Sequence, residues 1–238
     1  MNVLAIGNSF SSDATRYLHA IARENGVKLE VANLYIGGCS LERHYRNMLS
    51  GERAYELCYN GNHTGFSVSM QEALLNREWD VITLQQASHF SFDKASYQPY
   101  ITELAAFVRK YQPRAKILIH QTWAYEDGSA RLHDVAGFGT SVGMLGGIKD
   151  AYAEAAKAIN ADGMIPSGEM FAALLKNGVP KIHRDTFHAS FGLGRYALAL
   201  LWYHIITGKS VKDDRFCDFD EPVTNYEQKL VRETVDSF

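Results

Sequence analysis

The chain has 238 residues, of which 46% are hydrophobic and 21% charged, with a formal net charge of -3. This length is enough to bury a large core, and the composition is that of a globular protein. A near-neutral chain has no general attraction for nucleic acid or for anionic membranes, so we expect neither as a partner. The longest apolar run, 196–206, is too short for a membrane span, which needs roughly 20 residues.

Cysteine usage and the first residues bear on the compartment. The three cysteines, Cys39, Cys58 and Cys217, form no Cys-x-x-Cys pair, so a zinc knuckle or redox motif is not expected. The chain leads almost at once into a strand-like run at 3–6, without the basic and apolar regions of a secretory signal. We therefore expect a cytoplasmic protein, with a secreted or periplasmic protein trimmed of its signal as the alternative. The oligomeric state stays open.

Short apolar runs alternate with helical patterns along the chain. The run at 3–6 predicts a first strand, and Ser12 is the predicted cap of a helix that ends at Gly26. Further elements are predicted in the same way: strands at 27–36, 80–84, 115–120 and 163–166, and helices at 69–76, 97–111, 148–159 and 193–208.

This alternation favours an α/β fold, a three-layer α/β/α sandwich around a parallel sheet of about five strands. No repeat, linker or low-complexity tract interrupts the chain, so a single domain over 1–238 is the simplest organisation. Ligands of such sheets bind beyond the carboxyl ends of the strands. The residues that directly follow each predicted strand are therefore the candidates for a functional site.

Two of these segments suit attack on a carbonyl group. Ser9, within Gly7-Asn8-Ser9-Phe10-Ser11, stands between a buried strand and a helix start, close to backbone N–H groups that can hold an oxyanion. The alternative is that Ser9 is only a turn or cap residue. Gly37 and Gly38 follow the second predicted strand, and glycine there permits close approach of the backbone to a ligand.

Two further segments supply polar side chains of the matching chemistry. Gln85 and Gln86 follow the third predicted strand, and a side-chain amide at a strand tip can donate to an oxyanion. Near the end of the chain, Asp185 and His188 stand three residues apart. This spacing brings the carboxylate to one imidazole nitrogen and leaves the other nitrogen to face a serine, as in a Ser-His-Asp triad.

The four segments occur in the order found in the SGNH hydrolases, the superfamily that includes GDSL esterases and lipases. The run around Ser9 resembles the first family block, Gly-Asp-Ser, and Gly37-Gly38 resembles the second-block glycine. Asp185-x-x-His188 matches the fifth block. The resemblance implies the flavodoxin-like SGNH fold, no cofactor, Ser9 as nucleophile, His188 as general base and Asp185 as its orienter. It also implies an oxyanion hole that includes the backbone N–H groups of Ser9 and Gly38.

The sequence departs from the family pattern at two places. Asn8 stands where the family has aspartate, and Leu84-Gln85-Gln86-Ala87 replaces the third block, Gly-x-Asn-Asp. Gln85, in preference to Gln86, would then serve as the side-chain oxyanion donor. This pattern resembles carbohydrate-esterase branches of the superfamily.

The resemblance implies hydrolysis of acyl esters, with O-acetyl esters, including those of carbohydrates, favoured. The substrate is then a small molecule or a carbohydrate ester. His89 follows the third predicted strand, and Trp123 and Tyr125 follow the fourth. We interpret these side chains as substrate-binding, because aromatic rings at strand tips can stack on a sugar ring. The alternative is that the aromatic rings cap the core.

Other functional interpretations compete with the esterase. Gly139-Thr140-Ser141-Val142-Gly143 matches the G-x-S-x-G pattern, but no buried strand leads into it as that elbow requires. His183, Asp185 and His188 could instead bind a metal ion in a metal-dependent hydrolase. A third possibility is a catalytically inactive carbohydrate-binding protein on the same fold. Sensitivity to chelators and labelling by a serine-directed fluorophosphonate separate these alternatives.

Overall fold

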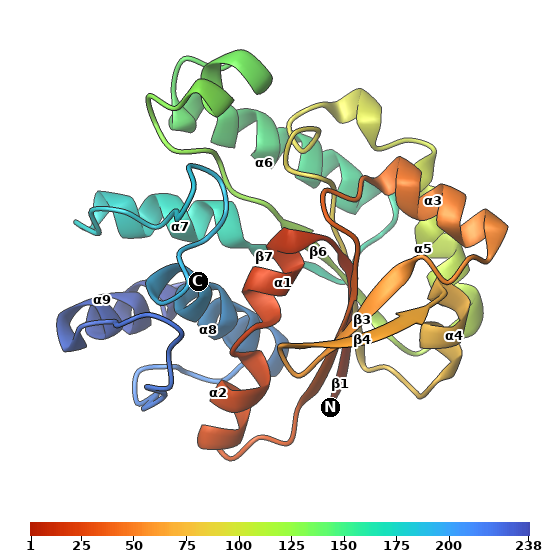
Figure 1. The fold of residues 1–238 in the computed structure, drawn as a ribbon, viewed down its shortest axis with the longest axis horizontal. Helices are drawn as coiled ribbons and strands as arrows, with labels where there is room; N and C mark the ends of the chain where they lie inside the picture. Colours follow the sequence, from red (N-terminus) through yellow and green to blue (C-terminus); the bar gives the residue numbers. More distant parts are fainter.

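A twisted seven-stranded sheet runs through the middle of the molecule in the order β4-β3-β2-β1-β5-β6-β7 (Figure 1). The computed structural model describes residues 1–238. Five strands run parallel: β1 (Asn2–Gly7), β2 (Glu30–Tyr35), β5 (Val81–Leu84), β6 (Lys116–Gln121) and β7 (Gly163–Pro166). The antiparallel strands β3 (Tyr55–Tyr59) and β4 (Asn62–Val68) extend one edge.

The order of the parallel strands confirms the predicted flavodoxin-like sandwich. Numbered among themselves, these strands lie in the order 2-1-3-4-5, which is that of the flavodoxin-like doubly wound sheet. Helices cover both faces, and strands such as β5 are therefore buried throughout. Burial on two faces explains why these strands are visible in the sequence as short apolar runs.

The β3–β4 hairpin is the part of the sheet that the sequence analysis missed, so the predicted strand count was too low. Its two-residue loop, Asn60-Gly61, has positive φ at both positions, 49° and 82°. Asn-Gly is the preferred pair for such a tight turn. Most of β4 is exposed and polar, so it lacks the apolar run that marks the central strands.

The helices form two layers, one on each face of the sheet (Figure 1). Two short single turns, a 3-10 turn (Lys94–Ser96) and a π-helical turn (Arg131–Val135), lie in connecting segments. One layer contains α1 (Ser9–Thr15), α2 (Leu18–Glu24), α7 (Ser167–Lys176), α8 (Leu193–Thr207) and α9 (Asn225–Val235), and the other contains α3 (Leu41–Ser50), α4 (Met70–Leu75), α5 (Tyr100–Tyr111) and α6 (Ser141–Ala158).

The single helix predicted from Ser12 to Gly26 is two helices, α1 and α2, and the first begins earlier than predicted. Ser12 lies inside it, and the cap is Asn8, whose side-chain oxygen accepts a hydrogen bond from the Phe10 N–H at 3.0 Å. The predicted capping box of Ser69 and Glu72 is present at the start of α4. The predicted helices at 97–111, 148–159 and 193–208 are confirmed with shifted bounds, whereas α3, α7 and α9 were not predicted.

Helix α8 lies within the core and accounts for the longest apolar run of the chain. From Tyr196 to Tyr203 each of its residues is buried. A helix that is apolar all round is expected in the interior of a protein of this size. None of the helices has the length and apolar character needed to cross a bilayer.

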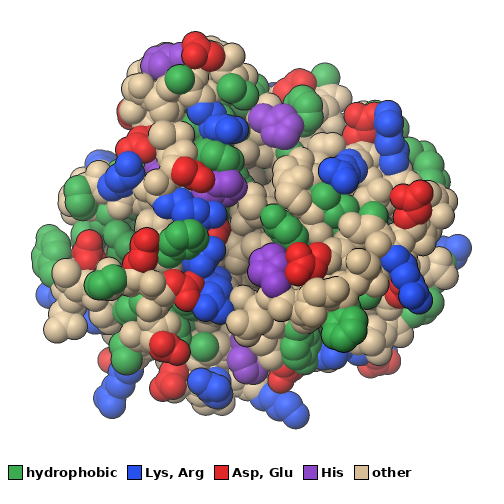
Figure 2. Space-filling model, in the orientation of Figure 1, with side chains coloured by type: hydrophobic (Ala, Val, Ile, Leu, Met, Phe, Trp, Pro, Cys, Tyr) green, Lys and Arg blue, Asp and Glu red, His purple; other side chains and the backbone are tan.

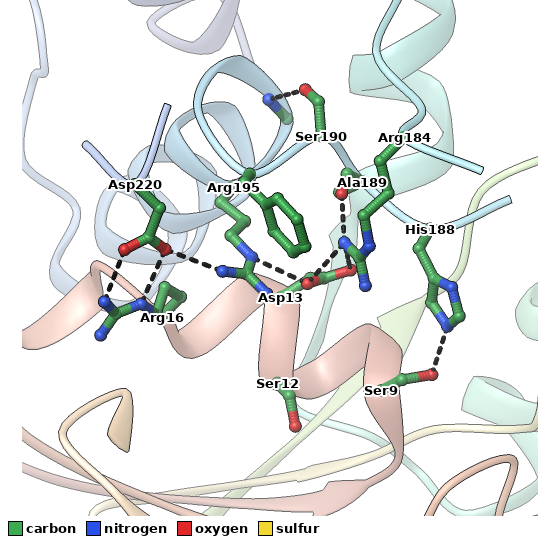
Figure 3. A network of polar contacts seen from close by, with 12 residues as sticks. Ser9, Ser12, Asp13, Arg16, Arg184, His188, Ala189, Ser190, Arg195 and Asp220 are labelled. Atoms are coloured by element: carbon green, nitrogen blue, oxygen red, sulfur yellow. Dashed lines mark hydrogen bonds and ion pairs between the residues drawn. The ribbon is translucent and has the colours of Figure 1, made fainter. Parts of the chain in front are cut away.

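A buried ion-pair network joins α1 to α8 and to the segment that precedes α8 (Figure 3). The side chain of Asp13, on α1, is only 1% exposed. Its carboxylate accepts hydrogen bonds from Arg195 Nε at 2.9 Å and from Arg184 Nη1 at 2.9 and 3.0 Å. Burial raises the pKa of the Asp13 carboxyl, and the two guanidinium groups oppose that shift.

Asp220 extends this network towards the surface. Its carboxylate accepts hydrogen bonds from Arg16 Nε at 2.9 Å and from Arg195 Nη1 at 2.8 Å. The bonds from Arg16 lower the pKa of the Asp220 carboxyl to about 2. Two carboxylates, those of Asp13 and Asp220, are therefore shared by the three guanidinium groups of Arg16, Arg184 and Arg195.

Replacing Asp13 by alanine should destabilise the fold strongly. The change leaves the Arg184 and Arg195 guanidinium groups facing each other without their shared carboxylate, and removing one partner of a buried ion pair costs about 3–5 kcal/mol. Urea denaturation of Asp13→Ala measures the loss. Asp218→Asn, at an exposed aspartate of the same network region, is the control and should change the free energy of unfolding by less than about 0.5 kcal/mol. Equal stability of the two variants would contradict this account.

Candidate active site

The candidate site lies at the carboxyl ends of β1, β2 and β5, where the strand order reverses. The turn from β1 into α1 passes through Gly7, which has no room for a side chain. A Cβ at Gly7 would lie 2.4 Å from Ser11 Oγ and 2.9 Å from Gln85 Oε1. Glycine therefore lets the ends of β1 and β5 approach closely and puts Ser9 at the first position of α1.

The structure brings Ser9, His188 and Asp185 into one chain of hydrogen bonds. His188 Nε2 lies 2.8 Å from Ser9 Oγ, and Nδ1 lies 2.7 Å from Asp185 Oδ2 (Figure 3 shows the first contact). Partial burial would raise the pKa of the Asp185 carboxyl, but hydrogen bonds from His188 outweigh burial and lower it. An ionised Asp185 holds the proton on Nδ1 and leaves Nε2 to accept from the Ser9 hydroxyl.

A tight turn sets the spacing of Asp185 and His188. Asp185 Oδ1 accepts hydrogen bonds from the backbone N–H groups of His188 at 2.8 Å and Phe187 at 3.4 Å. Thr186, between them, has φ of 74°, a left-handed conformation that a β-branched residue rarely adopts. Such strain, which costs about 1–3 kcal/mol, is typical of functional turns held by their surroundings. The Arg184–Asp13 ion pair holds this turn against α1.

Two residues with backbone N–H groups suited to an oxyanion line the same pocket. Ser9 provides the first N–H of α1, which has no partner within the helix. Gly38 follows β2 in a left-handed conformation, with φ of 62°, and lines the pocket together with Ser9. Ser9 and Gly38, from the ends of two neighbouring strands, thus line one pocket.

The two glutamines lie beneath the pocket. The Gln85 amide nitrogen donates to Asn8 Oδ1 at 2.7 Å, and Gln85 Oε1 lies 2.9 Å from His120 Nδ1. Burial lowers the pKa of His120 to about 3, so its neutral ring donates to Gln85. The Gln86 amide bonds to Ser96 and to the N–H of Leu41.

This placement corrects the role that the sequence suggested for Gln85. The Gln85 side chain is 1% exposed and is absent from the residues that line the pocket. Its amide orients Asn8, which in turn caps α1. Gln85 is therefore a positioning residue for the turn that carries Ser9.

The interpretation of Trp123 and Tyr125 as substrate-binding residues is wrong. Both are completely buried. Trp123 stacks on Phe10, with ring centroids 4.1 Å apart, and its Nε1 donates to the Phe187 carbonyl at 2.7 Å. The Tyr125 hydroxyl pairs with Ser88 Oγ at 3.0 Å. These rings form the floor beneath the triad, which was the alternative interpretation.

The pocket at the triad has a volume of about 360 Å³. His89 is among its lining residues, and so are three residues that were not predicted as site residues: Tyr35, Arg131 and Phe187. Tyr35 is the last residue of β2, and Phe187 lies between Asp185 and His188 in the sequence. Both residues could therefore have been predicted from their places beside a strand end and the triad motif. Figure 2 shows one face of the molecule hollowed near its middle, where basic side chains and histidines gather.

The competing motifs have different surroundings. His183 is buried, its Nε2 lies 3.0 Å from the Ala124 carbonyl, and burial lowers its pKa. No group of three or more His, Cys, Asp or Glu side chains is placed to hold a metal ion. Ser141 begins α6, follows a loop instead of a strand, and donates its hydroxyl to Asp127 at 2.8 Å.

Comparison with known proteins supports the fold and identifies the family. No curated protein matches the sequence. A crystal structure of a DUF4886 family protein from Bacteroides uniformis matches all of this chain and 93% of its own, with a TM-score of 0.91 and 30% identity.

More distant structures share the fold of the SGNH hydrolases. A candidate SGNH hydrolase from Slackia heliotrinireducens has a TM-score of 0.63 at 22% identity, over 87% of this chain and 98% of its own. An acetylxylan esterase from Geobacillus stearothermophilus has a TM-score of 0.51 at 13% identity, over 87% of this chain and 92% of its own. The family model described as domain of unknown function DUF4886 matches residues 2–236, and the chain therefore belongs to this family, on an SGNH hydrolase fold.

Proposed function

We propose that the protein is a serine esterase that hydrolyses acyl esters through a Ser9 acyl-enzyme. The observation that carries the proposal is the hydrogen-bonded chain from Ser9 Oγ through His188 to Asp185, with links of 2.8 and 2.7 Å. This is the arrangement that a nucleophile, its base and an orienting carboxylate require. The SGNH hydrolase fold supports it.

The geometry supports the following sequence of steps. His188 Nε2 takes the Ser9 proton as Oγ attacks the ester carbonyl, and the N–H groups of Ser9 and Gly38 stabilise the oxyanion. His188 then returns the proton to the departing alcohol, which leaves the acyl group on Ser9. A water molecule, activated by His188 in the same way, releases the acid. Asp185 stabilises the imidazolium in both halves of the reaction.

For the substrate, we propose a short acyl group, with O-acetyl esters of carbohydrates the first to test. The pocket is small and partly walled by the rings of Tyr35 and Phe187, together with His89. Such rings suit a sugar face, and the acetylxylan esterase among the structural neighbours acts on a carbohydrate ester by its name.

Replacing Ser9 by alanine should abolish ester hydrolysis. Loss of the nucleophile of a comparable triad lowers turnover by about a million-fold. The measurement is hydrolysis of p-nitrophenyl acetate, butyrate and longer esters, together with labelling by a fluorophosphonate. Ser12→Ala is the matched control, because Ser12 lies in the same helix with its side chain turned away from His188 (Figure 3). Labelling or turnover retained in Ser9→Ala would overturn the proposal.

His188→Ala should be far more damaging to turnover than His183→Ala. Only His188 contacts both Ser9 and Asp185, whereas His183 bonds a backbone carbonyl. Asp185→Asn should lower kcat by about 10⁴-fold, because an amide favours the wrong imidazole tautomer.

EDTA should leave activity intact. Loss of activity on chelation that zinc or manganese restores would favour the metal-dependent hydrolase.

Gln85→Ala should lower kcat only through Asn8. A direct oxyanion donor contributes about 10²–10³-fold to kcat by itself. A positioning residue should instead show coupling, so that Gln85→Ala has a much smaller effect in an Asn8→Ala background than in wild type. The double-mutant cycle on kcat and KM measures this coupling, and unfolding midpoints identify any loss of fold. Full, additive effects in the cycle would return Gln85 to the oxyanion hole.

A further inference from the structure

Arg131 is the one lysine or arginine in the wall of the pocket, and no aspartate or glutamate lines that wall. It begins the π-helical turn that follows β6. Its guanidinium carbon lies 3.7 Å from the centroid of the Phe187 ring and 5.8 Å from that of Tyr125. The guanidinium therefore stacks on an aromatic face at the pocket instead of extending into solvent.

The charge of Arg131 is not neutralised as those of the nearby arginines are. Arg184 and Arg195 pair with Asp13, and Arg195 also pairs with Asp220. No ion pair to a carboxylate involves Arg131, and its guanidinium lies over two aromatic rings. The pocket thus keeps a fixed positive charge beside the nucleophile.

His89, which lies in the segment after β5 and lines the same pocket as Arg131, does not carry a second positive charge at neutral pH. Burial lowers the pKa of His89, and the positive charge of Arg131 lowers it further. A neutral His89 contributes a hydrogen-bonding ring, whereas Arg131 contributes the charge. An anionic group on a ligand would meet a single guanidinium here.

The contacts of Phe187 relate Arg131 to the place where the alcohol departs. The Phe187 ring contacts the Arg131 guanidinium. It also contacts the His188 ring, and the centroids of these two rings are 3.8 Å apart. His188 delivers its proton to the departing alcohol, so the alcohol lies next to His188. Arg131 and the site of the departing alcohol are therefore neighbours of the same pair of contacting rings, Phe187 and His188.

We infer that Arg131 binds an anionic group, a carboxylate by preference, on the alcohol half of the ester. The planar guanidinium offers a fork of N–H donors that matches a carboxylate, and stacking on Phe187 holds that fork in place. This inference rests on the proposed esterase activity and narrows its substrate class to acidic esters, including acylated acidic sugars.

The test compares 4-acetoxybenzoate with its neutral methyl ester. The two leaving phenols differ in intrinsic reactivity, so the quantity compared is the ratio of their kcat/KM values in each protein. Arg131→Gln should lower the ratio of anionic to neutral ester by roughly 10-fold relative to wild type, the effect expected for a lost charge-assisted hydrogen bond. Arg131→Lys should restore part of it. The wild-type ratio should also fall with added salt.

Arg114→Gln is the matched control. Arg114 precedes β6, at the opposite end of the sheet from the pocket, and its side chain is 78% exposed. This variant should keep the wild-type ratio. The acyl half is tested with mono-p-nitrophenyl succinate against p-nitrophenyl butyrate, a pair whose ratio should not depend on Arg131.

Calorimetric binding of both acetoxybenzoates to Ser9→Ala gives a readout without turnover, and the anionic ester should bind more tightly. A ratio unchanged in Arg131→Gln, with active enzyme, overturns the inference and leaves the esterase standing. A dependence on Arg131 confined to the succinate pair overturns the assignment to the alcohol half. If wild type cleaves no ester and resists the fluorophosphonate, the proposed function fails, and equal binding of both acetoxybenzoates would then overturn the anion site as well.

Discussion

The side-chain amide of Asn8 connects the three strand ends from which the site is built. Its oxygen accepts from the Phe10 N–H of α1 and from Gln85 at the end of β5, and its nitrogen donates to the Cys39 carbonyl beyond β2 at 3.1 Å. Each of its polar atoms is thus used, and the residue is 1% exposed. The relative positions of the Ser9 and Gly38 N–H groups depend on this one planar group.

The other half of the site is held from the opposite side of α1. Asp13 is one helical turn beyond Ser9 and pairs with Arg184, next to the residue that orients His188. The nucleophile and its base are therefore fixed to the same short helix, one through its capped start and the other through a buried carboxylate. A hydrogen-bonded base must be positioned within a few tenths of an ångström, and rigid support of this kind supplies that positioning.

The parts of the fold that could be predicted from sequence are those with a strong local signal. Central parallel strands such as β5 are buried on both faces and are therefore visible as apolar runs, and the Asp185-x-x-His188 spacing is short enough to be recognised directly. The β3–β4 hairpin had a usable turn signal in Asn60-Gly61, but its exposed strands have no apolar pattern. Helix α9 likewise begins with a capping box of Thr224 and Glu227, a signal that is present in the sequence but was not used to predict the helix.

Side-chain direction was the part that sequence could not give. Trp123 and Tyr125 follow a strand end just as His89 does, yet they point into the core while His89 lines the pocket. Gln85 occupies the position expected of an oxyanion donor, but its amide is taken up by Asn8. Arg131 lies in a π-helical turn with no periodic pattern, and only the three-dimensional contact with Phe187 reveals it.

The distance along the chain between Ser9 and His188, 179 residues, has a consequence for the newly made protein. The serine leaves the ribosome well before His188, directly after a strand, β1, that pairs with the later segments β2 and β5. Until the turn at 183–188 has docked on α1, Ser9 has no base and the alcohol remains a weak nucleophile. Long-range pairing of this kind forms late in folding. A nascent or partly folded chain thus lacks an activated serine, and the triad arises together with the native topology.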